Sequence, residues 1–293
     1  MEIIIPFFAG LSYALAGIGH KITSTYGNVT TIQNAAFCSV CGVVLFGIRG
    51  TTEFATFSPD LLILVVIIGV TQYLGMIFLN TALKIGPLSP AWCAISLVFM
   101  PAVIFSAVVF GEPLTQWHIV SLIFICCAIY FASGNGKQQK EMKGWRAKLL
   151  YGTVLSAMLL SCSLCSIGLK VAFYHHATGH EQTLLAESKE LLMGMMYLCL
   201  GICCCIHLTL TKTWVFNRAG WTGGALVSVC TLGAYLLQLM IMELPAAIVF
   251  AMTYSVSVLV SGILSTVFFR EKRTLNWYLT LVCAVTAILL MLL

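Results

Sequence analysis

The chain has 293 residues, of which 60% are hydrophobic and only 9% are charged, and its mean hydropathy is +1.01. Soluble globular domains carry about 25% charged residues, so this composition excludes a soluble protein and indicates one that is embedded in lipid. The net charge of +5 does not indicate nucleic-acid binding, because the basic residues are sorted among particular loops.

Ten apolar runs follow one another along the chain, each near the roughly 20 residues that an α-helix needs to cross the hydrocarbon layer. They cover residues 3–20, 29–48, 61–83, 88–110, 117–134, 148–169, 190–210, 221–242, 246–268 and 275–293. The remaining residues form short loops and ends, which leave no room for a separate soluble domain. We therefore predict an all-α membrane protein with ten transmembrane helices.

A segment of the first run, residues 11–22, recurs in the sixth run as residues 160–171, at a constant offset of 149 positions. The identical residues are Leu11, Ser12, Leu15, Ile18, Gly19 and Lys21, which match Leu160, Ser161, Leu164, Ile167, Gly168 and Lys170. The copies start five spans apart, and an odd number of spans places the second copy upside down in the membrane. The sequence therefore predicts two inverted five-helix repeats, an arrangement found in many transporters.

The longest polar segment of the chain separates these two repeats. We expect a first five-helix repeat at residues 1–136, a basic linker loop at 137–147 and a second five-helix repeat at 148–293. A second echo near the fourth span of each half supports this division. It consists of Phe110-Gly111-Glu112 followed by Trp117, and of Phe269-Arg270-Glu271 followed by Trp277.

The basic residues indicate how the spans are oriented. Of the 15 Lys and Arg residues, 12 belong to the loops that follow the odd-numbered spans, and the loops that follow the even-numbered spans hold only Arg49, Lys170 and Lys189. Because loops rich in Lys and Arg stay in the cytoplasm, both termini are predicted to be non-cytoplasmic, in a cell (inner) membrane. The start, MEIIIPFF, has neither a basic region nor a cleavage site, so we expect the first run to be kept as a span.

Together these features resemble the EamA type of the drug/metabolite transporter (DMT) superfamily. The matching features are ten spans in two sets of five, a Glu closing the fourth span of each half, Pro101 eleven residues before Glu112, and a Lys after the first span of each half. The second half has Val260 where the first has Pro101. The resemblance covers essentially the whole chain and implies a ten-helix transporter. Members of the superfamily generally have cytoplasmic termini, the reverse of what the loop charges indicate here.

Polar side chains in the third and eighth runs are the first candidates for a substrate site, since polar groups are costly in lipid. In the third run Gln72 and Asn80 share one helix face, with Tyr73 close to it. In the eighth run Gln238 lies 158 positions after Asn80, at an equivalent depth, and Tyr235 lies one turn earlier. Asn80 and Gln238 are therefore expected to hydrogen-bond one polar ligand between them. Alternatively, the amides only link neighbouring helices, at about 0.6 kcal/mol each.

Other runs supply further candidates for substrate binding. Trp92 and Ser96 in the fourth run and Tyr254 in the ninth stand beside stripes of small residues, and they could stack on a ligand or hydrogen-bond to it. Such stripes are also typical of closely packed helices. Ser12, with Tyr13 beside it, and Ser161 are weaker candidates, because a serine often bonds to the backbone of its own helix.

Lys21 and Lys170 are candidate gate residues. The duplication places them at matching ends of inverted helices, and so at opposite faces of the membrane. Each could attract anionic substrates to its mouth or bond to carbonyl groups of a gate. The alternative is that each lysine extends its ammonium group from a helix end into water.

Several patterns are absent from the sequence. There is no P-loop, HExxH or GxSxG motif, and no Asp or Glu lies in the middle of a span. The cysteines, most of them inside the runs, are interpreted as small packing residues. We therefore expect no enzyme activity, no cofactor and no metal.

The sequence favours a secondary transporter that moves a small polar metabolite by alternating access. The expected partners are a small-molecule substrate and membrane lipids, with no nucleic acid, and a homodimer is left open. The alternatives are a multidrug or lipid-like exporter and, in another class, a non-transporting membrane scaffold.

Overall fold

The computed structural model describes residues 4–23, 29–53, 59–85, 95–133, 145–177, 189–212, 218–242, 244–268 and 275–291. The end of the first predicted repeat at 136 and residues 137–144 of the predicted linker lie outside the described residues, whereas residues 145–148 belong to a described helix. Helices make up nearly all of what is described. They are α1 (Ile4–Thr23), α2 (Val29–Glu53), α3 (Pro59–Ile85), α5 (Phe99–Val109), α6 (Gln116–Ser133), α7 (Trp145–Ala177), α9 (Lys189–Thr211), α10 (Arg218–Met240), the π-helix η2 (Ala247–Met252), α11 (Thr253–Phe268) and α12 (Leu275–Met291).

Each of the ten apolar runs contains a described helix, and η2 and α11 together form the ninth. The prediction of a membrane protein built from apolar helices is confirmed. Among the described residues, the stretches long and apolar enough to cross a membrane are Pro59–Ala82, Trp145–Ala172, Leu191–Thr211, Trp221–Met240 and Ala247–Leu264. The other apolar helices are shorter, over Ile4–His20, Ala36–Gly47, Phe99–Val109, Gln116–Phe131 and Leu275–Leu290. Helices are expected here because hydrocarbon offers no partner for an open backbone N–H or C=O group.

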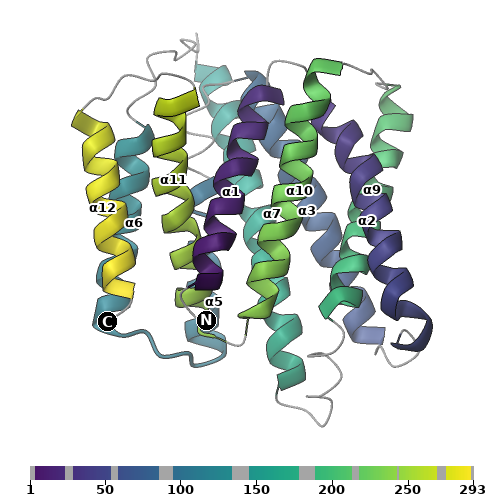
Figure 1. Ribbon diagram of the computed structural model, residues 1–293, viewed down its shortest axis with the longest axis horizontal. Helices are drawn as coiled ribbons and strands as arrows, with labels where there is room; N and C mark the ends of the chain where they lie inside the picture. Colours follow the sequence, from purple (N-terminus) through teal and green to yellow (C-terminus); the bar gives the residue numbers. More distant parts are fainter. Residues whose placement is uncertain are drawn as a thin grey trace.

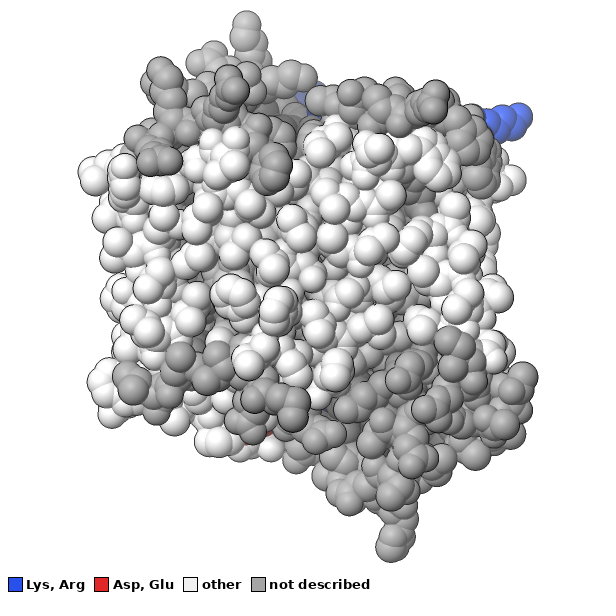
Figure 2. Space-filling view, viewed as in Figure 1, with Lys and Arg blue, Asp and Glu red and all other residues white. Residues whose placement is uncertain are grey.

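The outer surface of the bundle is apolar. Figure 2 shows one face of the molecule, and none of the described residues visible in the middle of that face is Lys, Arg, Asp or Glu. Large hydrophobic side chains are widely exposed on several helices, for example Val108, Leu210 and Leu275. In water such a surface would drive aggregation, but in a bilayer it is the surface that contacts the acyl chains.

The helices pair mainly between the two halves of the chain. α1 packs against α10, and α7, which carries the second copy of the repeated segment, packs against α3 (Figure 1). α2 packs against α9, and α6 against α12. Replacing each helix by the one five spans away converts the α1–α10 pair into the α7–α3 pair and leaves the other two pairs unchanged. The pairing thus has the pattern of a two-fold axis between the halves.

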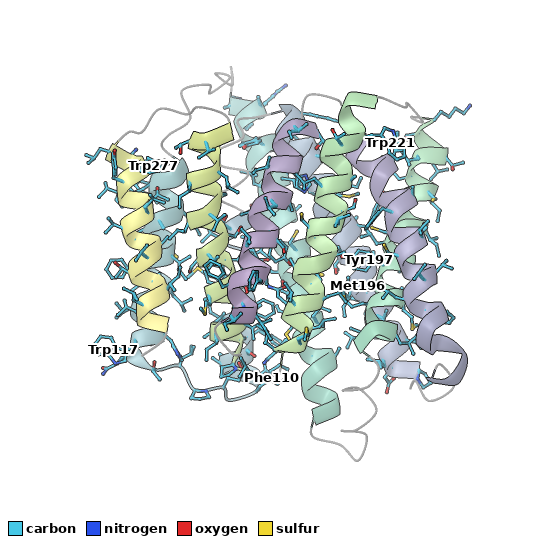
Figure 3. All side chains as sticks on the ribbon, in the orientation of Figure 1. Phe110, Trp117, Met196, Tyr197, Trp221 and Trp277 are labelled. Carbon is cyan, nitrogen blue, oxygen red and sulfur yellow. The ribbon has the colours of Figure 1, made fainter. Side chains whose placement is uncertain are left out.

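The repeated helices run in opposite directions. In Figure 1, α1 starts at the lower end of the bundle and runs upward, whereas α7 runs downward. In Figure 3, Trp117 lies at the lower end and Trp277, its counterpart in the second echo, lies at the upper end. α1 starts and α12 ends at the same lower end, as an even number of crossings requires.

Two glycines of the repeated segment allow equivalent helix contacts. A Cβ atom on Gly19 would lie 2.6 Å from the carbonyl oxygen of Gly223 and 2.7 Å from a methyl group of Val227, both on α10. A Cβ atom on Gly168 would lie 2.6 Å from the Ile68 side chain on α3. Ile68 and Val227 are themselves 159 positions apart. The missing side chains therefore let α1 approach α10, and α7 approach α3, in the same way.

Candidate substrate site and gate

Tyrosine and glutamine side chains from three helices meet inside the bundle. The hydroxyl group of Tyr13 on α1 donates a hydrogen bond to Oε1 of Gln238 on α10, at 3.1 Å. The hydroxyl group of Tyr235, also on α10, donates to Oε1 of Gln72 on α3, at 2.9 Å. The rings of Tyr13 and Tyr235 meet edge to face with centroids 5.9 Å apart. Both halves of the chain therefore contribute to one polar group.

A stack of aromatic rings adjoins these hydrogen bonds. The ring of Tyr254 on α11 stacks on Tyr13, with centroids 5.6 Å apart and 14° between the planes. On α5, Phe99 stacks on Tyr254 at 5.7 Å and 26°. These separations suit offset stacking of aromatic rings. We refer to Tyr13, Gln72, Phe99, Tyr235, Gln238 and Tyr254 as the aromatic-amide cluster.

Two buried polar atoms inside the bundle have no hydrogen-bond partner among the described residues. Nε2 of Gln238 is one, and the Gln238 side chain is only 1% exposed. The other is the hydroxyl group of Tyr197 on α9, whose side chain is 2% exposed (Figure 3 labels Tyr197). A buried polar group without a partner costs about 1–3 kcal/mol. Such atoms mark places where a ligand could supply the missing bond.

The cluster contains four of the residues that the sequence indicated for substrate binding, Gln72, Tyr235, Gln238 and Tyr254. Asn80 lies eight residues after Gln72 on α3, and no bond joins it to the cluster among the described hydrogen bonds. Its Nδ2 atom is buried and has no hydrogen-bond partner within the described part of the chain. The structure therefore places Gln238 and Asn80 in different surroundings, although both retain an unused amide donor.

Other predicted residues lie apart from the cluster. The hydroxyl group of Tyr73 lies 2.9 Å from Nδ1 of His207 on α9, and the two rings meet edge to face. Tyr73 follows Gln72 by one residue and so points about 100° away around the helix axis. Tyr73 therefore links α3 to α9 and does not reach the aromatic-amide cluster.

The predicted serine and tryptophan residues have different surroundings. The Ser161 hydroxyl bonds to the carbonyl of Ala157 in its own helix. The Ser12 hydroxyl faces Gly233 on α10, where an added Cβ would lie 3.9 Å away. Ser96 is half-buried just before α5, and Trp92 lies outside the described residues.

Phe99, a member of the cluster, and Tyr197, whose ring is buried inside the bundle, were not indicated by the sequence. Phe99 stands among apolar residues of the fourth run, and Tyr197 among those of the seventh, so neither interrupts an apolar pattern. Only the packing of α5 and α9 against the rest of the bundle brings their rings inward.

Lys170, a predicted gate residue, forms a buried ion pair near the lower end of the bundle. Its Nζ atom lies 2.7 Å from Oε1 of Glu112, and the two side chains are 3% and 15% exposed. The same ammonium group donates to the backbone carbonyls of Met242 at 3.0 Å and Leu244 at 2.7 Å. The other carboxylate oxygen of Glu112 accepts from the backbone N–H of Ala246 at 2.6 Å. All three N–H donors of Lys170 are thereby used.

We refer to this arrangement as the lower lock: Lys170, Glu112 and the backbone of Met242, Leu244 and Ala246. It joins α7 and the end of α5 to the turn between α10 and η2. Phe110, labelled at the lower end in Figure 3, lies two residues before Glu112. Lys21 belongs to the last turn of α1, but its side chain lies outside the described part of the structure.

Gly111 explains why Glu112 reaches the lock. Helix α5 ends at Val109, and Phe110 still donates its N–H to the carbonyl of Ser106. Gly111 then adopts φ +66°, in the left-handed region that favours glycine, and turns the chain out of the helix. Glu112 is thereby directed to Lys170 and to the N–H group of Ala246, the residue just before η2, where a carboxylate is favoured by the helix dipole.

The described cysteines are all free thiols. Within the described residues, no group of three or more His, Cys, Asp or Glu side chains is placed to hold a metal ion. The described site therefore offers stacking surfaces and amide and hydroxyl groups.

A multi-pass helical bundle with polar side chains buried between its two halves is the class of protein that these observations define. Residues 1–134 match the EamA-like transporter family. The match covers the region of the first predicted repeat, and this family is part of the drug/metabolite transporter superfamily that the motifs of the chain resemble. A crystal structure of another protein superposes with a TM-score of 0.76 at 15% sequence identity, over 99% of this chain and 95% of that one. That likeness shows the fold. None of the curated proteins matches the chain in sequence.

Proposed function

We propose that this protein is a secondary transporter that moves a small polar metabolite across the cell membrane by alternating access. The observation that carries the proposal is the aromatic-amide cluster, which is buried inside a lipid-facing bundle and is built from helices of both halves. Polar groups at such a depth are costly and are by default candidates for a functional site. The EamA-like family match supports transport as the function.

The arrangement of the helices supports two inverted five-helix repeats. The α1–α10 and α7–α3 pairs are equivalent under exchange of the halves, and the repeated helices run in opposite directions. In such a fold one half can rock against the other around a fixed central site, which opens to each side in turn. The cluster lies between the halves, as this mechanism requires.

The lower lock is proposed as one of two gates. Lys170 ties α7 of the second half to Glu112 of the first half and to the turn before η2, so the lock spans both halves. The residues that repeat Lys170 and Glu112 are Lys21 and Glu271. We propose that these two form the equivalent lock at the opposite end when the lower lock is open. The loop charges assign the lower end to the outside of the cytoplasm, so the lower lock would close the outer mouth.

Transport can be tested with the purified protein in proteoliposomes, over radiolabelled nucleobases, amides, amino acids, sugars and organic acids. Gln238→Ala is expected to reduce flux of the transported solute about tenfold or more, since one lost hydrogen bond to a ligand costs on the order of 1.5 kcal/mol. Asn80→Ala tests the second predicted amide. Gln116→Ala is the matched control, because Gln116 is exposed at the start of α6.

The outcomes separate the proposal from its alternatives. Flux of one polar class that Gln238→Ala reduces and Gln116→Ala does not would support it. Flux restricted to lipophilic cations or lipids would identify an exporter of that kind. The absence of flux for every class, with the protein folded and inserted, would favour a membrane scaffold.

A further inference from the structure

The hydrogen-bonding atoms that the aromatic-amide cluster leaves unused include an amide donor. The side-chain oxygens of Gln238 and Gln72 each accept a hydrogen bond from a tyrosine hydroxyl. Nε2 of Gln238 is buried, and no described residue is its hydrogen-bond partner. Since the oxygen and nitrogen belong to one amide group, this N–H donor lies directly beside the Tyr13 hydroxyl. A ligand that completes the site must therefore present a hydrogen-bond acceptor there.

The rings beside that donor form a stacked column that ends in the flat faces of Tyr13 and Phe99. Tyr13, Tyr254 and Phe99 form a column with interplanar angles of 14° and 26°. Columns of this kind accommodate a further planar ring by stacking, because the attraction between ring faces needs no particular atoms. The three rings come from three different helices and from both halves of the chain, so the column itself joins the two halves.

The cluster itself carries no formal charge, since its members are tyrosines, glutamines and a phenylalanine. Lys170 and Glu112 neutralise each other in the lower lock and use their donors and acceptors there. An anion would lack a cationic partner among the cluster residues. A cation would find favourable ring faces, but the free amide N–H of Gln238 would repel it.

We propose that the central site recognises a flat, uncharged ring that carries hydrogen-bond acceptors, such as a nitrogen heterocycle with a carbonyl or amide group. The ring stacks on the Tyr13–Tyr254–Phe99 column, and an acceptor atom receives the N–H of Gln238. This assignment rests on the proposed function in taking the cluster as the substrate site, and it names the chemical class of the substrate.

The test uses one ring in three charge states. Nicotinamide is neutral, nicotinate is anionic and 1-methylnicotinamide is cationic, while acetamide has the amide without the ring. Adenine adds a neutral two-ring compound. Binding of each to the purified full-length protein in detergent is measured by calorimetry. We expect nicotinamide or adenine to bind about tenfold or more tightly than nicotinate, 1-methylnicotinamide and acetamide, as loss of a stacking or hydrogen-bonding partner predicts.

Variants connect the binding to the cluster. Tyr254→Leu removes the central ring and is expected to weaken binding of the neutral ring compound about tenfold or more. Tyr254→Phe keeps the ring, and its affinity is expected to stay within about threefold of that of the unchanged protein. Gln238→Leu is expected to reduce the preference for acceptor-bearing rings. Tyr130→Leu is the control, since Tyr130 is exposed on α6 away from the cluster. Size-exclusion profiles establish that each variant is folded.

The assignment is overturned if a charged form or acetamide binds as well as the neutral rings, if no neutral ring binds, or if Tyr254→Leu binds like the unchanged protein. The proteoliposome assay keeps this result distinct from the proposed function. Flux of a sugar or amino acid without ring binding would overturn the ligand class alone. Ring binding that depends on Tyr254, with no flux of any solute, would overturn transport and leave the ligand class standing.

Discussion

The ammonium group of Lys170 lies 2.7 Å from the carboxylate of Glu112, although the two residues belong to different halves of the chain. The pair also bonds to backbone groups on both sides of the turn that leads into η2. Tyr254 follows η2 by two residues and stacks in the aromatic-amide cluster. A π-helix, which is less regular than an α-helix and frequent at functional sites, therefore connects the lower lock to the proposed substrate site.

Lys170→Met is expected to destabilise the protein by about 3–5 kcal/mol, because it leaves the carboxylate of Glu112 without its partner in a poorly hydrated place. The double variant Lys170→Met/Glu112→Gln is expected to recover part of that loss. Thermal unfolding in detergent measures both, and additive effects in the double-mutant cycle would contradict a coupled pair. Lys170→Arg, which keeps the charge, is the control.

Gly111→Ala is expected to destabilise the protein by about 1 kcal/mol or more, since alanine is strained at φ +66°. The change also disturbs the direction in which Glu112 leaves α5. Gly152→Ala is the matched control, because Gly152 is exposed within α7 and a Cβ there meets no atom within 4 Å. Equal unfolding temperatures for the two variants would show that the left-handed turn is unimportant.

Gly19→Ala is expected to cost more stability than Gly168→Ala, although the two residues are equivalent in the repeat. The new Cβ at Gly19 meets the backbone carbonyl of Gly223, which moves only with α10, whereas the one at Gly168 meets the Ile68 side chain, which can adjust. Overpacking of this kind costs about 1–3 kcal/mol. Unfolding temperatures in one detergent check the order, and the reverse order would argue against the close α1–α10 contact.

Tyr73→Phe and Tyr235→Phe remove the same hydroxyl group from two tyrosines with different roles. Tyr235→Phe frees the Gln72 oxygen inside the cluster and is expected to lower transport several-fold. Tyr73→Phe removes the bond to His207 between α3 and α9, at a cost of about 0.6 kcal/mol, and is expected to leave the transport rate unchanged. Solute uptake by proteoliposomes distinguishes them, and equal losses would contradict the separation of the two sites.

The sequence alone determined the number, order and type of the helices. Long apolar runs in lipid have to be helical, since each backbone polar group needs a partner within its own segment. The duplicated segment, with its Gly and Lys at matching positions, also indicated which helices are equivalent and drew attention to Lys170. Gln72, Tyr235, Gln238 and Tyr254 were recognisable as candidates because a polar side chain in an apolar run is conspicuous.

Only the tertiary structure decided which of these residues meet. Gln72 and Tyr73 are neighbours in the sequence, but their side chains leave α3 in directions about 100° apart, toward the cluster and toward α9. Phe99 and Tyr197 were hidden among apolar residues until α5 and α9 turned them inward. The partners of Lys170 lie 58 positions before it and 72 and 74 positions after it in the sequence. The spacing along one helix sets the direction of a side chain, but the packing of several helices sets what lies in that direction.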